Sequence, residues 1–180
     1  MKILKVFALV VGIAVVLLLG IAAVTKKEYS VARDATINLP KDKVFAYLVQ
    51  LKNQDNFSVW ASMDKDMKKT YRGTDGSVGF VSAWDSAKDD VGAGEQEIKK
   101  ILPGERIDFE LRFLRPFESK SDAFLKTEAV EPNKTKVTWG FSAKMPYPMN
   151  LMLLFMDFEG MIGKDFETGL LNLKLLLERK

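Results

Sequence analysis

The sequence contains no cysteine and no histidine in its 180 residues. Without cysteine the chain can form neither a disulfide bond nor a thiolate metal site, and it has no cysteine nucleophile. Without histidine it lacks the most common general base and transition-metal ligand, which excludes Ser-His-Asp and Cys-His catalytic arrangements. Any enzyme chemistry would have to use a carboxylate, a lysine or a tyrosine.

Other signatures of binding are also missing. The sequence has no glycine-rich phosphate loop, dinucleotide fingerprint or cluster of metal-ligand residues, so we expect no metal and no cofactor. The formal charge is only +3, and Lys2 and Lys5 at the N-terminus contribute two of these charges. The rest of the chain is nearly neutral with its charges interspersed, which argues against nucleic acid as a partner.

A long apolar run lies near the N-terminus. Residues 6–24 carry no charge and have two lysines on each side. About 20 apolar residues cross the hydrocarbon core of a bilayer, whereas a cleaved signal peptide has a shorter apolar region of about 7–15 residues. We therefore expect residues 1–27 to form a single-pass membrane anchor and residues 28–180 to form a domain that is soluble when produced alone. Because a short N-terminal tail with two lysines commonly stays inside, the domain is expected outside the cytoplasm.

The domain should begin with one strand and two short helices. Residues 29–39 alternate between apolar and polar side chains, which predicts a half-buried strand with Arg33 on its apolar side. Pro40 is typical of a helix start, and the polar stretch that ends on Trp60 predicts a second, shorter helix or a turn.

Further strands follow, separated by short turn sequences. They are predicted at residues 67–72, 78–84, 95–102, 105–114, 119–130 and 135–144. Successive strands joined by short turns form an antiparallel meander. The apolar face of such a sheet needs a cover, and only the C-terminal segment is large enough to provide it.

The C-terminal segment, residues 148–180, is predicted to form one long helix. Pro148 suits the first helical position, and no proline follows it. Its first part, residues 149–158, is apolar nearly all round, so it should be buried or border a cavity or a membrane. Three glycines in this segment indicate tight packing or a bend, or room for a ligand against the backbone.

A family resemblance rests on the segments VARDATINLP (31–40) and VFAYL (44–48) and on the order of elements. The chain from about Tyr29 to Lys180 resembles the START-like (SRPBCC) superfamily, in particular its polyketide cyclase/dehydrase and lipid-transport branch. The resemblance implies an α+β helix-grip fold, with a seven-stranded curved antiparallel sheet around a long C-terminal helix and an apolar cavity between them. Members bind lipids, sterols, polyketides or other hydrophobic ligands, and only some are enzymes. The branch has no common catalytic residues, so none can be assigned here.

We expect a hydrophobic small molecule or lipid to bind between the sheet and residues 149–162. The predicted lining consists of Trp139, Phe109, Phe141, Met152, Met156, Glu159 and Arg33. Glu159 falls on the apolar side of the predicted helix, where a carboxylate needs a cation, hydrogen-bond donors or a proton, and Arg33 is its predicted partner. Glu159 would then hold a polar group of the ligand, and would act as the acid or base if there is catalysis. Alternatively, a bend at Gly160 or Gly163 would turn Glu159 to the surface.

Three functions are compatible with these features. The favoured one is a membrane-anchored protein that binds or transports a hydrophobic small molecule or lipid. The alternative is a polyketide cyclase or aromatase-like enzyme that uses the same cavity, and the third is a chaperone-like interaction domain for a membrane protein. An apolar cavity would favour binding, buried converging polar groups would favour the enzyme, and a filled cavity with an exposed apolar patch would favour the interaction domain.

Overall fold

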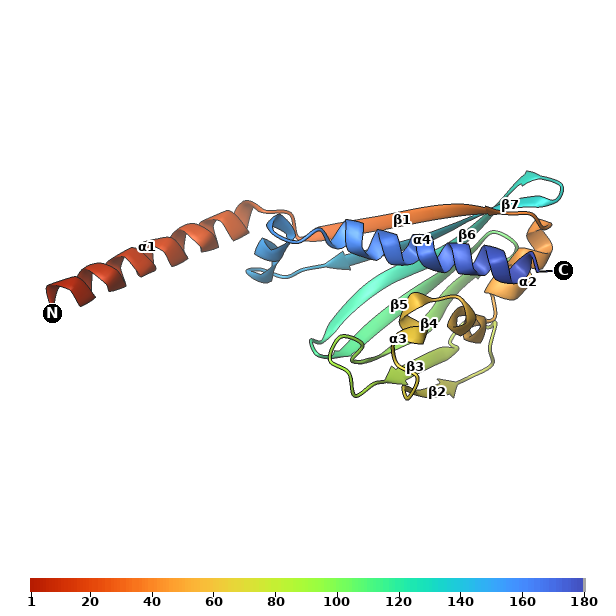
Figure 1. Ribbon diagram of the computed structural model, residues 1–180, viewed down its shortest axis with the longest axis horizontal. Helices are drawn as coiled ribbons and strands as arrows, with labels where there is room; N and C mark the ends of the chain where they lie inside the picture. The colour runs from red at the N-terminus through yellow and green to blue at the C-terminus, as the bar shows by residue number, and fades with distance from the viewer. Residues whose placement is uncertain (180) are drawn as a thin grey trace.

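The computed structural model describes residues 1–179, which form a projecting apolar helix and an α+β body (Figure 1). The projecting helix, α1 (Lys2–Val24), is long and apolar enough to cross a membrane, and its composition equally fits a signal sequence. Its side chains are exposed except for Ala22, close to the body. The predicted apolar helix is therefore present.

The body is built on one curved antiparallel sheet. The strands are β1 (Glu28–Ile37), β2 (Lys68–Arg72), β3 (Val81–Asp85), β4 (Ala93–Leu102), β5 (Arg106–Arg115), β6 (Ser119–Glu131) and β7 (Lys134–Lys144). Their order in the sheet is β1-β7-β6-β5-β4-β3-β2, so β2 to β7 form a meander and β1 pairs with the last strand. All seven predicted strands are confirmed, with ends within three residues of those expected.

Helices cover the concave face of the sheet. They are α2 (Lys41–Leu48), the 3-10 helix η1 (Leu51–Asn56), α3 (Val59–Met63) and α4 (Phe158–Leu177), whereas the 3-10 helix η2 (Met149–Leu154) contacts α1. In Figure 1, α4 runs along β1, while α2 lies at the end of the sheet opposite α1. This arrangement is the helix-grip fold, as predicted.

The C-terminal segment is not one continuous helix, and that part of the prediction is wrong. The chain leaves the helical path between η2 and α4, and α4 begins at Phe158. The cause is Asp157, which caps the new helix: its carboxylate accepts a hydrogen bond from the backbone N–H of Gly160 at 2.8 Å. An aspartate at this position is a recognised helix-start signal, and it outweighs the surrounding apolar pattern.

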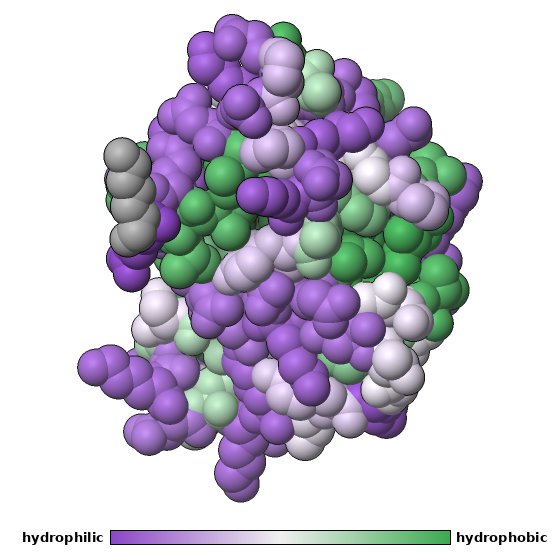
Figure 2. Space-filling view, turned by 90° about the vertical axis from the view of Figure 1, so that its right-hand side faces the viewer, coloured by the Kyte–Doolittle hydropathy of each residue, from purple (hydrophilic) through white to green (hydrophobic). Residues whose placement is uncertain are grey.

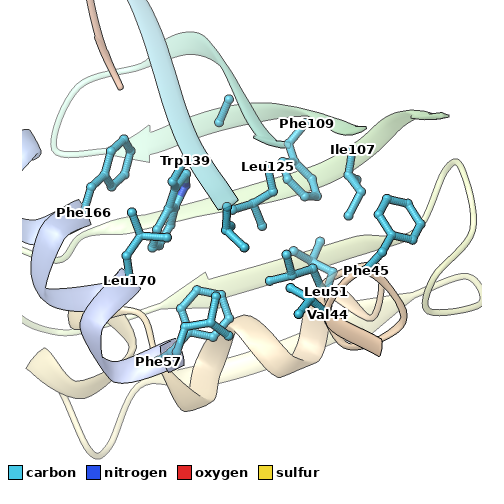
Figure 3. Packing of buried hydrophobic residues seen from close by; sticks show 14 of the residues in the cluster. Val44, Phe45, Leu51, Phe57, Ile107, Phe109, Leu125, Trp139, Phe166 and Leu170 are labelled. Carbon is cyan, nitrogen blue, oxygen red and sulfur yellow. The ribbon is translucent and has the colours of Figure 1, made fainter. Parts of the chain in front are cut away.

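The core joins α4 to the sheet through aromatic rings (Figure 3). Trp139 on β7 stacks on Phe166 of α4, with ring centroids 4.5 Å apart, and meets Phe57 edge-on at 5.6 Å. Further from α1, the side chains of Ile107 and Phe109 on β5 are fully buried in the same cluster.

Two glycines let α4 lie close to the sheet. A Cβ atom at Gly169 would lie 2.9 Å from Cζ3 of Trp139 and 3.3 Å from the carbonyl oxygen of Phe57. The place of a side chain at Gly163 is taken by the guanidinium group of Arg33. The glycines therefore serve tight packing, and the backbone at these two positions has no room for a ligand.

Gly169→Ala should destabilise the domain more than Gly163→Ala. The methyl group at position 169 would displace a buried ring, which costs about 1–3 kcal/mol, and the better helix propensity of alanine returns at most about 1 kcal/mol. At position 163 the methyl group would displace only the flexible end of Arg33, so we expect the free energy of unfolding to change by no more than about 1 kcal/mol. Urea unfolding of the full chain in detergent micelles measures both. Equal losses would contradict this account of the packing.

The convex face of the sheet is polar and centres on Arg112. This side chain donates to Glu97 at 2.7 Å and to Glu110 at 2.5 Å, and its guanidinium lies 3.5 Å from Glu95. Hydrogen bonds from Arg112 and neighbouring basic groups hold the pKa of Glu97 below its usual value. Partial burial raises the pKa of Glu95, but hydrogen bonds from Arg72 and Arg112 outweigh it and lower the pKa overall.

The Arg112 cluster should make stability depend on acid pH. Because the pKa values of Glu95 and Glu97 are lowered on folding, their contribution is present above the unfolded value of about 4.3 and is lost as pH falls through the folded values. Arg112→Leu should therefore reduce stability by about 1 kcal/mol or more at pH 7 and by less at pH 3. Arg106→Leu, which removes a cation paired with Asp108 alone, should show a smaller pH difference in the same unfolding assay.

Candidate functional site

The apolar concave face is less covered toward the α1 end of the sheet. Along β5, Ile107 and Phe109 are buried, whereas Leu111 and Phe113, nearer the β5–β6 turn, are only half-buried. This turn lies on the α1 side of the body (Figure 1). Other half-buried apolar side chains on this part of the concave side are Trp60, Trp84, Phe141 and Ile162. The space between sheet and helices is thus closed at the end near α2 and less covered toward α1.

Two adjoining grooves lie where α1 meets the body. The first, of about 440 Å³, runs over the ends of β1, β7 and β6. It is lined by Lys26, Glu28, Tyr29, Ser30, Lys120, Ser121, Asp122, Ser142, Ala143, Lys144 and Glu159. The second, of about 400 Å³, is lined by Lys26, Tyr29 and residues 153–159. Because they share Lys26, Tyr29 and Glu159, we treat them together as the α1-side groove.

The α1-side groove joins an apolar wall to a polar rim. The apolar wall runs from the end of η2 to the start of α4 and consists of Leu153, Leu154, Phe155, Met156 and Phe158. The rim carries lysines, carboxylates and serines from the strand ends. By strand register most of these, such as Glu28, Asp122 and Ser142, lie on the convex face, whereas Tyr29 lies on the concave face. Each part has a volume within the range of about 300–1,000 Å³ that is usual for small-molecule sites.

Tyr29 lies at the junction of the two parts. Its ring packs against Phe158 on α4, with centroids 5.6 Å apart, and against Phe141 on β7 at 6.2 Å. Partial burial raises the pKa of the Tyr29 hydroxyl above its ordinary value. The hydroxyl therefore stays protonated at neutral pH, where it can donate a hydrogen bond and is a poor base.

Two carboxylates at this groove pair with lysines at the surface. Glu159 lies 3.1 Å from the Lys26 amine, and Glu28 lies 2.8 Å from the Lys144 amine. All four side chains are substantially exposed, so these pairs are solvated and contribute little to stability. They give the rim polar groups of both signs.

Asn150 ties η2 to the end of α1. This buried side chain donates from Nδ2 to the carbonyl oxygens of Ala22 at 2.7 Å and Thr25 at 3.1 Å. The last carbonyls of a helix have no partner within the helix, so they need an external donor when they are buried. Asn150 therefore caps α1 from a segment more than a hundred residues away, and it holds the apolar wall against that helix.

The structure does not bring all the predicted site residues together. Trp139 and Phe109 are fully buried in the core. Phe141 lies beside Tyr29, Met156 and Glu159 line the α1-side groove, and Met152 belongs to η2. Residues 149–162 do not lie over the sheet as one element, as expected, because η2 contacts α1.

The predicted pairing of Arg33 with Glu159 is also wrong. Arg33 passes over Gly163, and its Nε donates to Glu167 at 2.6 Å. Glu159 is exposed and pairs with Lys26 instead. Within α4, Glu159 is on the same face as Phe166, but it lies in the first turn of the helix, where it pairs with Lys26 and is exposed. The alternative in which Glu159 reaches the surface is therefore nearer to the structure.

Two groove residues, Tyr29 and Phe158, and the supporting residue Asn150 were missed in the sequence. Tyr29 was detectable, because it alternates in phase with Val31 on the apolar side of β1. Phe158 follows the overlooked cap at Asp157, and Asn150 has no local sequence signal because its partners lie at the other end of the chain. No group of three or more acidic residues that could hold a metal ion occurs within residues 1–179, and the chain has no histidine or cysteine.

Asn150→Asp should loosen η2 from α1. The substitution keeps the shape but removes both donors, leaving buried carbonyls unpaired at a cost of about 1–3 kcal/mol, and it adds a negative charge at a helix C-terminus. Amide hydrogen exchange of residues 146–156, measured in detergent micelles, should become faster. Asn172→Asp is the matched control, because Asn172 donates to Phe57 at the other end of α4. Unchanged exchange in the Asn150 variant would contradict the capping role.

Comparison with known proteins identifies relatives by structure only. No family model matches the chain, and no curated protein matches its sequence. An uncharacterised protein from Rhizobium leguminosarum has 20% identity and a TM-score of 0.56, over 86% of this chain and 97% of that one. A Thermobifida fusca protein has 15% identity and a TM-score of 0.60, over 81% and 90%.

A third similar structure is DynU16, from the dynemicin biosynthetic locus. It has 13% identity and a TM-score of 0.56, over 83% of this chain and 47% of that one. At these identities the similarity concerns the fold alone. The chain shares the curved seven-stranded sheet and C-terminal helix of these proteins.

Proposed function

We propose that this protein is a membrane-anchored START-like (SRPBCC) domain that binds a hydrophobic small molecule or lipid. In this proposal residues 1–27 form the anchor and residues 28–180 form the binding domain. The ligand would lie in the part of the α1-side groove lined by Tyr29 and residues 153–159 and extend beneath α4 along the half-buried part of the concave face.

The observation that carries the proposal is the gradient of burial along the concave face. Apolar side chains are sealed near α2 but remain half-buried toward α1, where they approach a groove with an apolar wall and a polar rim. Ligand sites are typically apolar concave surfaces with a few polar groups that orient the ligand. Phe141 and Phe158 would contact the apolar part, while Tyr29, Lys26 and Glu159 would contact a polar group.

The anchor is supported by the Asn150 contacts. Cleavage of a signal peptide near Thr25 would remove Ala22, whose carbonyl Asn150 binds at 2.7 Å. The buried amide would then lose its best acceptor, which is costly. An uncleaved α1 keeps these hydrogen bonds and is long enough, at about 1.5 Å per residue, to cross a hydrocarbon core of about 30 Å.

The groove geometry supports binding more directly than catalysis. Two of its carboxylates, Glu28 and Glu159, are exposed and paired with lysines at the surface. Tyr29 has a raised pKa and keeps its proton, so it suits hydrogen bonding to a ligand. A cyclase-like enzyme would need a group that can take up a proton in this place.

Native mass spectrometry of the full chain, purified in a mild detergent, tests the proposal. We expect protein ions that carry a hydrophobic molecule. Phe158→Ala should lower the ratio of bound to free protein about tenfold, because it removes part of the apolar wall beside Tyr29. Phe117→Ala is the matched control, because Phe117 is an exposed phenylalanine outside both parts of the groove.

The result has clear alternatives. Equal adduct in the Phe158 and Phe117 variants would place the ligand elsewhere. An adduct whose mass changes on incubation with the protein would favour the enzyme. The absence of any adduct from the wild-type protein, together with co-purification of a membrane protein, would favour the interaction domain.

A further inference from the structure

A second apolar surface lies next to α1, on the segment between β7 and the first turn of α4. Within residues 147–161, six large apolar side chains are exposed. They are Tyr147, Met149, Leu154, Phe155, Met156 and Met161. The exposed fraction is 78% for Phe155, 58% for Met161 and 55% for Leu154. Such a cluster on one short segment differs from the scattered exposed apolar residues that are normal for proteins, and it marks a contact surface.

The structure fixes this surface at a particular position along α1. Asn150 donates to the carbonyl of Ala22, and Ala22 is the only buried residue of α1, so η2 lies beside the last turn of that helix. The apolar run ends at Val24, two residues later, which is about 3 Å along the helix axis. A bilayer crossed by residues 6–24 would therefore have its boundary at the level of η2.

The chemistry of the surface suits the interfacial region of a bilayer. Apolar and aromatic side chains of interfacial segments enter the headgroup and acyl boundary by about 5–10 Å. The nearest charges nearly balance, because Lys26 pairs with Glu159 and Lys144 pairs with Glu28. Binding of this surface to a bilayer should therefore depend on apolar contacts and should not require anionic lipid.

The opposite end of the molecule has a different surface. Figure 2 views the end of the body away from α1, where hydrophilic side chains predominate and hydrophobic ones lie in separate patches between them. Leu175 near the end of α4 is 55% exposed, equal to Leu154, but it lies on the part of the helix away from α1. It provides a matched comparison for the apolar surface.

We propose that residues 147–161 are seated in the interface of the same bilayer that α1 crosses. The body is then held by two contacts, and the α1-side groove, which shares Leu154, Phe155 and Met156 with this surface, faces the lipid. A hydrophobic ligand would enter from the bilayer without crossing water. This inference rests on the proposed anchor.

Site-directed spin labelling of the full chain tests the seating. Since the chain has no cysteine, Phe155→Cys, Met161→Cys, Leu175→Cys and Val15→Cys each provide one unique label. The variants are reconstituted into vesicles of phosphatidylcholine and of an equimolar mixture with phosphatidylglycerol. Collision of the label with oxygen, which concentrates in lipid, is compared with collision with a water-soluble nickel chelate.

Labels at positions 155 and 161 should be more accessible to oxygen than to nickel, in both types of vesicle. The label at 175 should show the reverse, and the label at 15 should lie deepest. If label 15 is deep and label 155 behaves like label 175, the seating is overturned and the anchor stands. If label 15 is itself in water, the anchor fails and the seating fails with it.

A second copy of the chain is the other possible occupant. In that case labels at position 155 would broaden each other's spectra, and dilution with unlabelled protein would remove the broadening while nickel accessibility stayed low. That result would overturn the proposal. The labelled positions are exposed, so the substitutions remove no core packing, and circular dichroism of each variant confirms that it is folded.

Discussion

The close contact between α4 and the sheet is the constraint on which the rest of the body depends. It is possible because Gly169 leaves room for Trp139 and Gly163 leaves room for Arg33. The stacking of Trp139 on Phe166 fills the space beneath the helix, so the middle of the fold is solid. An open concave surface can therefore exist only further along the sheet, where strands extend beyond this contact toward α1.

The strand pattern and the helix-grip fold were predictable, because alternation and turn residues act locally. β5 shows this well, since apolar and charged residues alternate from Ile107 to Phe113. The break at Asp157 was missed because an apolar run hid a single capping residue. The partners of Arg33 and Glu159 were missed because the sequence does not show that Glu159 lies in the first turn of α4 beside Lys26, while Arg33 reaches Glu167 further along the helix.

The link between Asn150 and α1 could not be predicted at all. Asparagine has no local signal that identifies a partner 128 residues away. Its contribution appears only when the two segments are placed together, where it satisfies carbonyls that an apolar environment would leave unpaired. The candidate site depends on this contact, because it places the apolar wall of η2 beside the ends of β1 and β7.

The break in the C-terminal segment explains how one apolar stretch can serve two surfaces. A single helix over residues 149–177 would have length of about 43 Å and would carry its apolar first half past the end of the sheet. With the break at Asp157, α4 covers the core while η2 folds back against α1. The side chains of residues 153–158 then form one wall of the α1-side groove. Exposure of these apolar side chains to water is unfavourable. If the wall adjoins a bilayer, the same residues can contact lipid on one side and line the groove on the other.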